Sequence, residues 1–213
     1  MNENLTYTQV QEYLQGLAHE RPEEMIQMEA YAKEHRFPII GPVCGYLCYQ
    51  VAHMIGAKKV YELGSGYGYS TAWFAKAVQE NGGGVVNHVV WDEELSRMAK
   101  EHLANLGYGG LVEYSVSEAT EALEQTPGPF DLVFCDIDKH GYPAALPVMK
   151  EKLRSGGVML VDNMLIQGRI FDDKDDTENV AGVREFTRMV NADPDWISTI
   201  IPIRDGLLLA WKK

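Results

Sequence analysis

Short, almost continuously apolar runs alternate with amphipathic segments along the middle of the chain. The apolar runs lie at 60–63, 85–91, 111–116, 132–135 and 158–161. Segments with the spacing of amphipathic helices separate them, at 70–79, 93–106, 118–125 and 142–153. Apolar runs of this kind are typical of strands that are covered on both faces. The alternation therefore predicts an α/β fold with right-handed crossovers and a parallel sheet.

The two ends of the chain depart from this alternation. Residues 6–55 have the pattern of three helices with no strand between them. Near the C-terminus, apolar runs at 196–203 and 207–211 are separated only by 204–206. Because that gap is too short for a helical crossover, the two strands must be antiparallel. We expect one domain over 1–213, with a helical N-terminal extension (1–55) before a sheet core (56–213).

Composition and charge restrict the partners. The 213 residues are 46% hydrophobic and 23% charged, which is typical of a globular protein. No apolar run approaches the roughly 18 residues that a membrane span needs. The formal net charge of −12 repels nucleic-acid backbones and anionic membrane surfaces. The first ten residues are polar and acidic, unlike a signal peptide, so we expect a cytoplasmic protein with no membrane partner.

Two smaller features have simple interpretations. The three cysteines, Cys44, Cys48 and Cys135, are too few for a disulfide framework, and we expect them to be buried small side chains in a reducing compartment. The charge run at 172–176 is expected to form a solvated loop.

The first candidate site is a glycine-rich turn, VYELGSGYGYS at 60–70, between a strand and a helix. Gly64, Gly66 and Gly68 allow a tight turn and a close approach by a ligand, and the helix start offers unpaired N–H groups. A dinucleotide fingerprint has the spacing G-x-G-x-x-G, whereas Tyr69 takes the place of the third glycine here. This departure disfavours a pyrophosphate site.

The residues around these glycines suit a ligand with an amino-acid end, such as S-adenosylmethionine. Glu62 precedes the turn and is a candidate to anchor an ammonium group. Ser65 lies between the first two glycines, and Ser70 is a candidate to bond a carboxylate. A purely structural turn is the alternative.

A second candidate site combines oxygen ligands from two strand ends. One apolar run ends at Asp136, and another ends at Asp162 and Asn163. Because neighbouring parallel strands end at the same edge of a sheet, we expect these side chains to lie beside the glycine turn. Two carboxylates and an amide carbonyl suit Mg²⁺ or a similar divalent ion. Capping of the following helices is the alternative role for these residues.

Two candidate bases follow Asp136. Lys139 lies three residues further on, and a nearby divalent cation gives a lysine a reason to lose its proton. A neutral Lys139 can act as a general base. His140 is the rival base, and a surface position is the alternative for both residues.

Taken together, these motifs resemble the metal-dependent O-methyltransferases that include the catechol and caffeoyl-CoA O-methyltransferases. The similarity runs from about residue 34 to the C-terminus and rests on ELGSGYGYS at 62–70, FDLVFCDIDKHGY at 130–142, GGVMLVDN at 156–163 and RDGL at 204–207. It implies a Rossmann-like class I methyltransferase with a mostly parallel seven-stranded sheet. It also implies S-adenosylmethionine as donor, Mg²⁺ held by Asp136, Asp162 and Asn163, and Lys139 as the base.

The sequence differs from this family at expected cofactor contacts. Val90 stands where the family has an acid that holds the ribose hydroxyls, and valine cannot accept those hydrogen bonds. Trp91 falls where an apolar side chain covers the adenine, and Asp92 is a candidate either to reach the ribose or to cap the next helix. Glu118 falls where relatives have an acid near the adenine edge, and we expect Ala119 beside it in the cofactor site.

The resemblance implies methyl transfer to a hydroxyl of a small, catechol-like acceptor. Ile166 stands where many relatives have Trp, so we do not expect the acceptor to be positioned as in the plant enzymes. Apolar residues of the N-terminal helices cover the core or a twofold partner, and we expect a homodimer; they are Met25, Ile26, Met28 and Tyr31.

Three alternatives stay open. MEAYAKEHRFPI at 28–39 resembles bacterial relatives that methylate hydroxyuridine in transfer RNA, although the net charge disfavours a polyanionic substrate. Val90 allows a non-catalytic module that only binds S-adenosylmethionine. A nicotinamide oxidoreductase is disfavoured by Tyr69 and by the antiparallel strand pair at the end of the chain.

Overall fold

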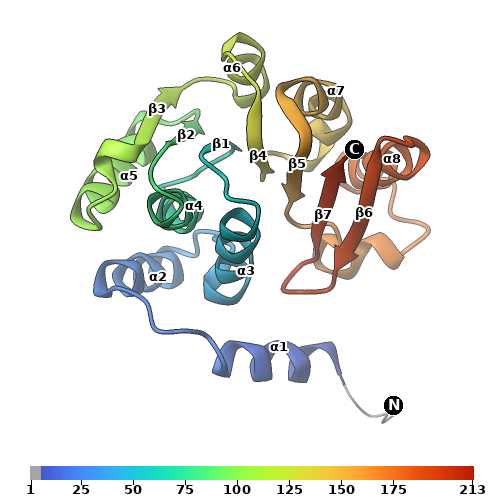
Figure 1. The fold of residues 1–213 in the computed structure, drawn as a ribbon. Coiled ribbons are helices and arrows are strands. Elements are labelled where there is room, and N and C mark those ends of the chain that lie inside the picture. Colours follow the sequence, from blue (N-terminus) through green and yellow to red (C-terminus); the bar gives the residue numbers. More distant parts are fainter. Residues whose placement is uncertain (1–5) are drawn as a thin grey trace.

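The fold is built around a seven-stranded sheet with the order β3-β2-β1-β4-β5-β7-β6 (Figure 1). The computed structural model describes residues 6–213, so residues 1–5 of the predicted N-terminal extension lie outside the described part. The first five strands run parallel, and β7 is antiparallel to both of its neighbours, β5 and β6. The strands are β1 (Lys59–Leu63), β2 (Val85–Val90), β3 (Val112–Val116), β4 (Phe130–Cys135), β5 (Leu153–Val161), β6 (Trp196–Ile201) and β7 (Leu207–Lys212).

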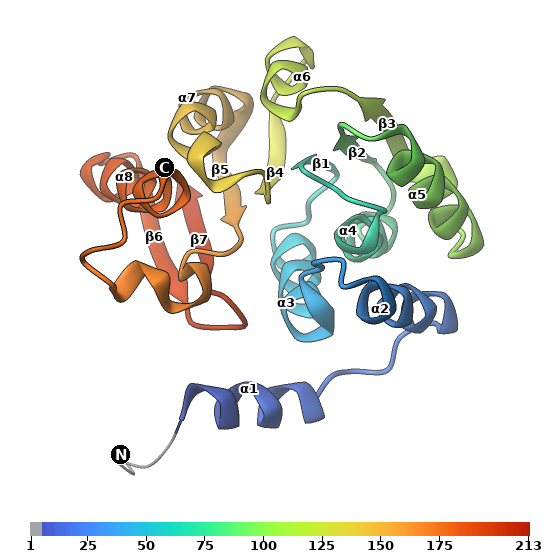
Figure 2. The same cartoon turned by 180° about the vertical axis from the view of Figure 1, so that it is seen from behind.

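Helices cover both faces of the sheet and enclose two hydrophobic cores (Figures 1 and 2). One face carries α2 (Glu23–His35), α3 (Gly41–Met54), α4 (Tyr69–Glu80) and α5 (Glu93–Asn105). The other face carries α6 (Ala119–Gln125), α7 (Tyr142–Lys152) and α8 (Glu178–Ala192). The predicted mostly parallel seven-stranded sheet with C-terminal antiparallel strands is confirmed.

The inner strands are mostly apolar because both of their faces are buried, whereas the edge strands β3 and β6 are partly exposed. In β4, Leu132 and Phe134 belong to the core on the α4 side, whereas Val133 and Cys135 belong to the opposite core. Successive side chains of a strand point to opposite faces, so a strand between two helical layers has no solvent-facing positions. The three cysteines are buried and free, as expected.

The structure differs from the sequence prediction mainly after residue 150. The helix α7 ends at Lys152 and β5 begins at Leu153, five residues before the predicted strand. The helix α8 was not predicted at all. Its buried face is formed by Val180, Val183, Phe186 and Val190, whose spacing is helical.

The three predicted N-terminal helices are present, and they differ in how they are packed. In α2, Met25 and Met28 are buried in the core, while Ile26 on the other side is exposed. The first helix, α1 (Tyr7–Gly16), lies apart from both helical layers and has no fully buried residue (Figure 1). It contacts the turn between β6 and β7, where the Tyr7 hydroxyl donates a hydrogen bond to the carbonyl of Arg204. Across residues 6–213, we find no helix with the length and apolar character needed to cross a membrane.

Candidate active site

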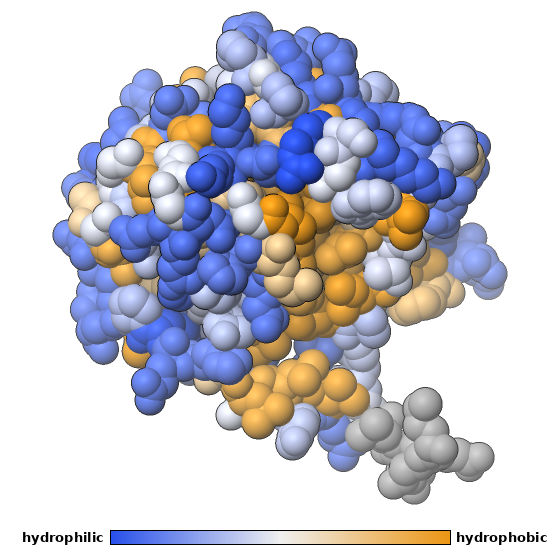
Figure 3. All heavy atoms as spheres, in the orientation of Figure 1, coloured by the Kyte–Doolittle hydropathy of each residue, from blue (hydrophilic) through white to orange (hydrophobic). Residues whose placement is uncertain are grey.

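A cavity of about 1680 Å³ lies at the edge of the sheet where the parallel strands end. Ten of the fourteen predicted site residues line it. Gly64, Ser65, Gly66, Ser70, Trp91, Glu118 and Ala119 come from the ends of β1, β2 and β3, and Asp136, Lys139 and Asn163 come from the ends of β4 and β5. Glu62, Gly68, Asp92 and Asp162 are not part of the lining. Figure 3 shows hydrophobic residues gathered on α1 and on the surface directly above it.

The glycine turn is fixed between the ends of β2 and β4. Gly64 has φ +85°, and a Cβ atom at this position would lie 2.5 Å from the carbonyl oxygen of Asp136. The Ser65 amide donates to the carbonyl of Val89 at 2.9 Å, and the Val89 amide donates to Ser65 Oγ at 3.0 Å. Gly68, at φ +92°, is the N-cap residue directly before α4 and packs against Ala99. These contacts fix the conformation of the turn and place it directly beside Asp136 at the end of β4.

Glu62 lies beneath this turn and not in the cavity, which differs from its expected direct contact with a ligand. Residues of β1 alternate between faces, and Glu62 shares with Val60 the face that packs on α4. There its carboxylate accepts a hydrogen bond from the Thr71 hydroxyl, whose oxygen is 3.0 Å from His88 Nδ1. Burial raises the pKa of Glu62 to about 7, although hydrogen bonds from neighbouring hydroxyls oppose this shift.

The end of β2 presents an apolar side chain and a large exposed ring. Val90 is buried at the cavity wall, and Trp91 lines the cavity with 83% of its surface exposed. Asp92 Oδ1 accepts a hydrogen bond from the Leu95 amide at 2.9 Å, so Asp92 takes the second of its two expected roles and caps α5. Glu118 caps α6 through the Glu121 amide at 2.7 Å and also lines the cavity.

Asp136 and Asp162 leave adjacent strands side by side. The strands β4 and β5 pair in parallel up to Cys135 and Val161, and each of these residues directly precedes one of the two aspartates. Asp136 Oδ1 lies 2.9 Å from Lys139 Nζ, which also donates to the carbonyl of Ile137 at 3.1 Å. The predicted base is therefore held at the cavity surface by the predicted metal ligand.

Asp162 is fully buried and pairs with an arginine from the β6–β7 turn. Its Oδ2 accepts a hydrogen bond from Arg204 Nη1 at 2.7 Å, and within residues 6–213 its Oδ1 has no hydrogen-bond partner. Burial and the negative charge of Asp136 raise the pKa of Asp162 to about 7, against the opposing effect of Arg204. Asp162 thus lacks the direct access to the cavity that Asp136 and Asn163 have.

Asn163 is oriented by a carboxylate. The residue has a left-handed backbone, with φ +58°, and its Nδ2 donates to Asp205 Oδ2 at 3.0 Å. This bond uses the amide nitrogen and leaves the amide oxygen free to accept, and Asn163 is part of the cavity lining. Asp205 also accepts the backbone amide of Gln167, so it connects the candidate ligand to the segment after β5.

These residues have the donor chemistry of a divalent cation site. The unpaired Oδ1 of Asp162, the amide oxygen of Asn163 and the carboxylate of Asp136 are hard oxygen donors. Among the described residues there is no suitable cluster of three or more His, Cys, Asp or Glu side chains, so the candidate set depends on Asn163. Each carboxylate already has a cationic partner, Lys139 for Asp136 and Arg204 for Asp162.

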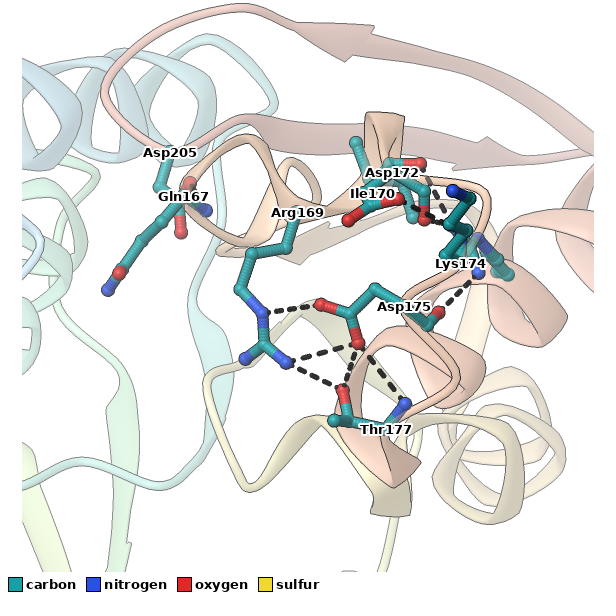
Figure 4. A network of polar contacts seen from close by, with 9 residues as sticks. Gln167, Arg169, Ile170, Asp172, Lys174, Asp175, Thr177 and Asp205 are labelled. Atoms are coloured by element: carbon teal, nitrogen blue, oxygen red, sulfur yellow. Dashed lines mark hydrogen bonds and ion pairs between the residues drawn. The ribbon is translucent and has the colours of Figure 1, made fainter.

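The segment after β5 forms an ordered wall of the cavity (Figure 4). It contains the short helix η3 (Ile166–Phe171), in which Ile166 is buried and Phe171 is 75% exposed. Arg169 binds Asp175 at 2.8 Å and Thr177 Oγ1 at 2.7 Å. The charge run at 172–176 is a largely exposed loop, as expected, and Asp175, with 14% of its side chain exposed, anchors it to Arg169.

Three residues at the cavity were not assigned a role from the sequence. Arg204 belongs to the RDGL motif, and a cation in a tight turn next to the acidic strand ends is a signal that could have been used. Tyr7 and Gln11 of α1 bind the backbone of Arg204 and line the cavity. Their position depends on where α1 lies in the folded protein, which no local pattern indicates.

The chain is similar to known O-methyltransferases in sequence and in fold. A family model described as O-methyltransferase matches residues 23–213. The catechol O-methyltransferase of Niastella koreensis is 27% identical over 218 residues, covering 97% of this chain and 98% of that protein. The O-methyltransferase TomG of Streptomyces achromogenes, solved in complex with SAM, is 28% identical, with a TM-score of 0.86 over 100% of both chains. An O-methyltransferase of Bacillus cereus in complex with SAH, at 24% identity and a TM-score of 0.87 over 97% of this chain and 98% of that one, shares the fold.

Proposed function

The chain belongs to the O-methyltransferase family, and on that premise we propose that it transfers the methyl group of S-adenosylmethionine to a hydroxyl of a small acceptor, assisted by a divalent cation. One observation carries this proposal. The glycine turn and the Asp136–Lys139 pair line the same cavity, and the turn packs directly against Asp136. A methyl donor and a base can therefore meet there.

The donor half of the cavity is formed by the glycine turn and the ends of β2 and β3. The start of α4 behind the turn offers backbone N–H groups to the carboxylate of the donor. Trp91 provides a flat apolar surface for the adenine ring, and Glu118 lies nearby at the wall. Because Val90 cannot accept a hydrogen bond from the ribose, we propose that stacking on Trp91 contributes more of the affinity for the nucleoside. TomG, which binds SAM, supports the assignment of the donor.

The acceptor half is apolar and suits an aromatic hydroxyl compound. Ile166 and Phe171 of η3 line the cavity after β5, and Ile39 lines it from the N-terminal segment. A catechol-like ring would bury apolar area against these side chains while its hydroxyl points toward Lys139. The similarity to a catechol O-methyltransferase supports this class of acceptor.

The chain's own residues can perform three tasks in the transfer. A divalent ion, if held by Asp136, Asp162 and Asn163, would supply a lowered pKa at the acceptor hydroxyl. Lys139, in its neutral form, accepts the hydroxyl proton at Nζ. The cavity aligns the acceptor oxygen with the methyl group and the sulfur, so that an O–C bond forms as the C–S bond breaks and S-adenosylhomocysteine leaves. Such positioning can supply roughly 7–11 kcal/mol of the rate enhancement.

A methyl-transfer assay tests this function. The protein is incubated with methyl-labelled S-adenosylmethionine, Mg²⁺ and a panel of catechols and monophenols, and labelled products are identified by mass spectrometry. We expect product with the wild type and none with Lys139→Met, while Lys33→Met, an exposed lysine on α2, retains activity. Label transferred to transfer RNA would favour the transfer-RNA methyltransferase instead. Heat of S-adenosylmethionine binding without any product would favour the non-catalytic binding module.

A further inference from the structure

The guanidinium of Arg204 occupies the cavity side of Asp162. Arg204 lines the cavity with 32% of its side chain exposed, whereas the side chain of Asp162 is 1% exposed. Their 2.7 Å contact uses Asp162 Oδ2. Within residues 6–213, the guanidinium of Arg204 makes no other hydrogen bond to the protein. One positive charge therefore already lies where a candidate cation ligand would face the cavity.

The backbone of Arg204 is held on both sides by α1. Gln11 Oε1 accepts the Arg204 amide at 2.8 Å, and the Tyr7 hydroxyl donates to the Arg204 carbonyl. Arg204 itself has a left-handed conformation, with φ +51°. The next residue, Asp205, holds the amide of Asn163. The β6–β7 turn and α1 thus determine the surroundings of two of the three candidate ligands.

We propose that the guanidinium of Arg204 is a built-in counter-cation for Asp162 that competes with a divalent ion for this carboxylate, and that α1 holds it in place. This inference rests on the proposed function, because it concerns the same cation site. A buried carboxylate needs a positive partner, and Arg204 supplies one when no metal is bound. A metal ion at Asp162 Oδ1 would lie close to the guanidinium on Oδ2 and be repelled by it, so the ion binds more tightly once Arg204 has moved away.

This competition couples cation binding to α1. Because the metal ion and Arg204 compete for Asp162, binding of the ion favours release of Arg204, and whatever strengthens the hold of α1 on Arg204 weakens the affinity for the ion. Tyr7 and Gln11 also line the cavity. A movement of Arg204 would therefore affect both the cation site and the cavity wall formed by α1.

Titration with Mn²⁺ alone, followed by calorimetry and by electron paramagnetic resonance, tests this proposal without an activity assay. Wild type is compared with Arg204→Gln and with Arg169→Gln as the matched control. Arg169 also lines the cavity, but its partners are Asp175 and Thr177. We expect Arg204→Gln to tighten the dissociation constant for Mn²⁺ about tenfold or more, and Arg169→Gln to change it less than about twofold, since only Arg204 contacts Asp162.

The outcomes separate this proposal from the proposed function. Equal affinity of wild type and Arg204→Gln for Mn²⁺ overturns the role of Arg204 and leaves metal-assisted transfer standing. Absence of Mn²⁺ binding in every variant overturns both the role of Arg204 and the cation part of the proposed function, and the methyl-transfer assay in chelator then tests what remains.

A second variant covers the case in which Arg204→Gln does not fold. Tyr7→Phe removes only the hydroxyl that binds the Arg204 carbonyl, and we expect it to tighten Mn²⁺ binding about threefold. Tyr13→Phe, on the same helix and 69% exposed, is its control and should leave the affinity unchanged. An unaltered affinity in Tyr7→Phe contradicts the role given to α1.

Discussion

Gly64 packs against Asp136 so closely that any larger residue at position 64 would meet the backbone of the acidic strand end. The Cβ atom of an alanine there would lie 2.5 Å from the Asp136 carbonyl oxygen. Because the clash involves backbone, no side-chain rotation relieves it. The two candidate sites found in the sequence are therefore one packed unit at the adjoining ends of β1 and β4.

Gly64→Ala is expected to destabilise the protein and to weaken binding of S-adenosylmethionine. The variant combines an unfavourable positive φ with the clash, and we expect a loss of about 2–4 kcal/mol in the free energy of unfolding. Gly82→Ala is the matched control, since Gly82 has φ +93° and open space around it, so it should cost about 1 kcal/mol. Chemical denaturation measures both; equal losses would show that the contact with Asp136 is unimportant.

Asp162→Asn is expected to reduce metal-dependent methyl transfer by a factor on the order of 100 while the protein remains folded. The amide keeps the size of the side chain and can still accept from Arg204, but it lacks the negative charge that a divalent ion needs. Asp195→Asn, at an exposed position before β6, serves as the control. Full activity of the wild type in excess chelator, or of Asp162→Asn, would argue for a site without metal.

His88 is expected to make the protein less stable at acidic pH. Burial, with a smaller effect of Lys100, lowers the pKa of His88 to about 3 in the folded protein, below its ordinary value of 6.5. Between these two values the unfolded chain binds a proton that the folded chain does not, so stability falls as the pH drops from about 6.5 toward 3. The slope attributable to this group approaches about 1.4 kcal/mol per pH unit.

Urea unfolding at several pH values checks this prediction. His88→Asn should unfold with a shallower dependence on pH than wild type between pH 6.5 and 4, whereas His53→Asn, which is exposed on α3, should keep the wild-type slope. Parallel slopes for all three proteins would mean that His88 is not held neutral in the folded state.

Trp91→Ala is expected to weaken S-adenosylmethionine binding about fivefold without a loss of stability. Trp91 is largely exposed at the cavity wall, so its removal leaves no buried void, but the adenine loses its stacking surface. Trp211→Ala is the control, since Trp211 lies on β7 away from the cavity. Calorimetry with S-adenosylmethionine gives the dissociation constants, and an unchanged value for Trp91→Ala would exclude stacking on this ring.

Most of the sheet could be predicted because its inner strands are mostly apolar on both faces. The runs that contain Val133 and Met159 are buried from both sides, and such runs stand out in any sequence. The helix α8 was missed although its buried residues have helical spacing, so the signal was present in the sequence. The course of the charged segment before it could not be predicted, because it depends on contacts such as those of Arg184 of α8 with the carbonyls of Asp172 and Asp175. Tertiary contacts of this kind leave no periodic signal.

The candidate site could be predicted as a set of strand ends but not as a set of contacts. Parallel pairing of β4 with β5 places Asp136 beside Asp162, which the order of the motifs already indicated. The burial of Glu62 follows from which face of β1 it occupies, and that face is known only once α4 is placed. The pairing of Asp162 with Arg204 joins residues 42 positions apart, and no local pattern specifies it.

The walls of the cavity come from separate stretches of the chain. The half assigned to the donor is formed by residues between 64 and 119, whereas the half assigned to the acceptor is formed largely by the segment after β5, by the β6–β7 turn and by the N-terminal residues. Substitutions in the second group can reshape one wall while the other keeps its geometry. On the proposed assignment, a change of acceptor therefore requires substitutions in the second group alone, while the surface that receives the nucleoside is retained.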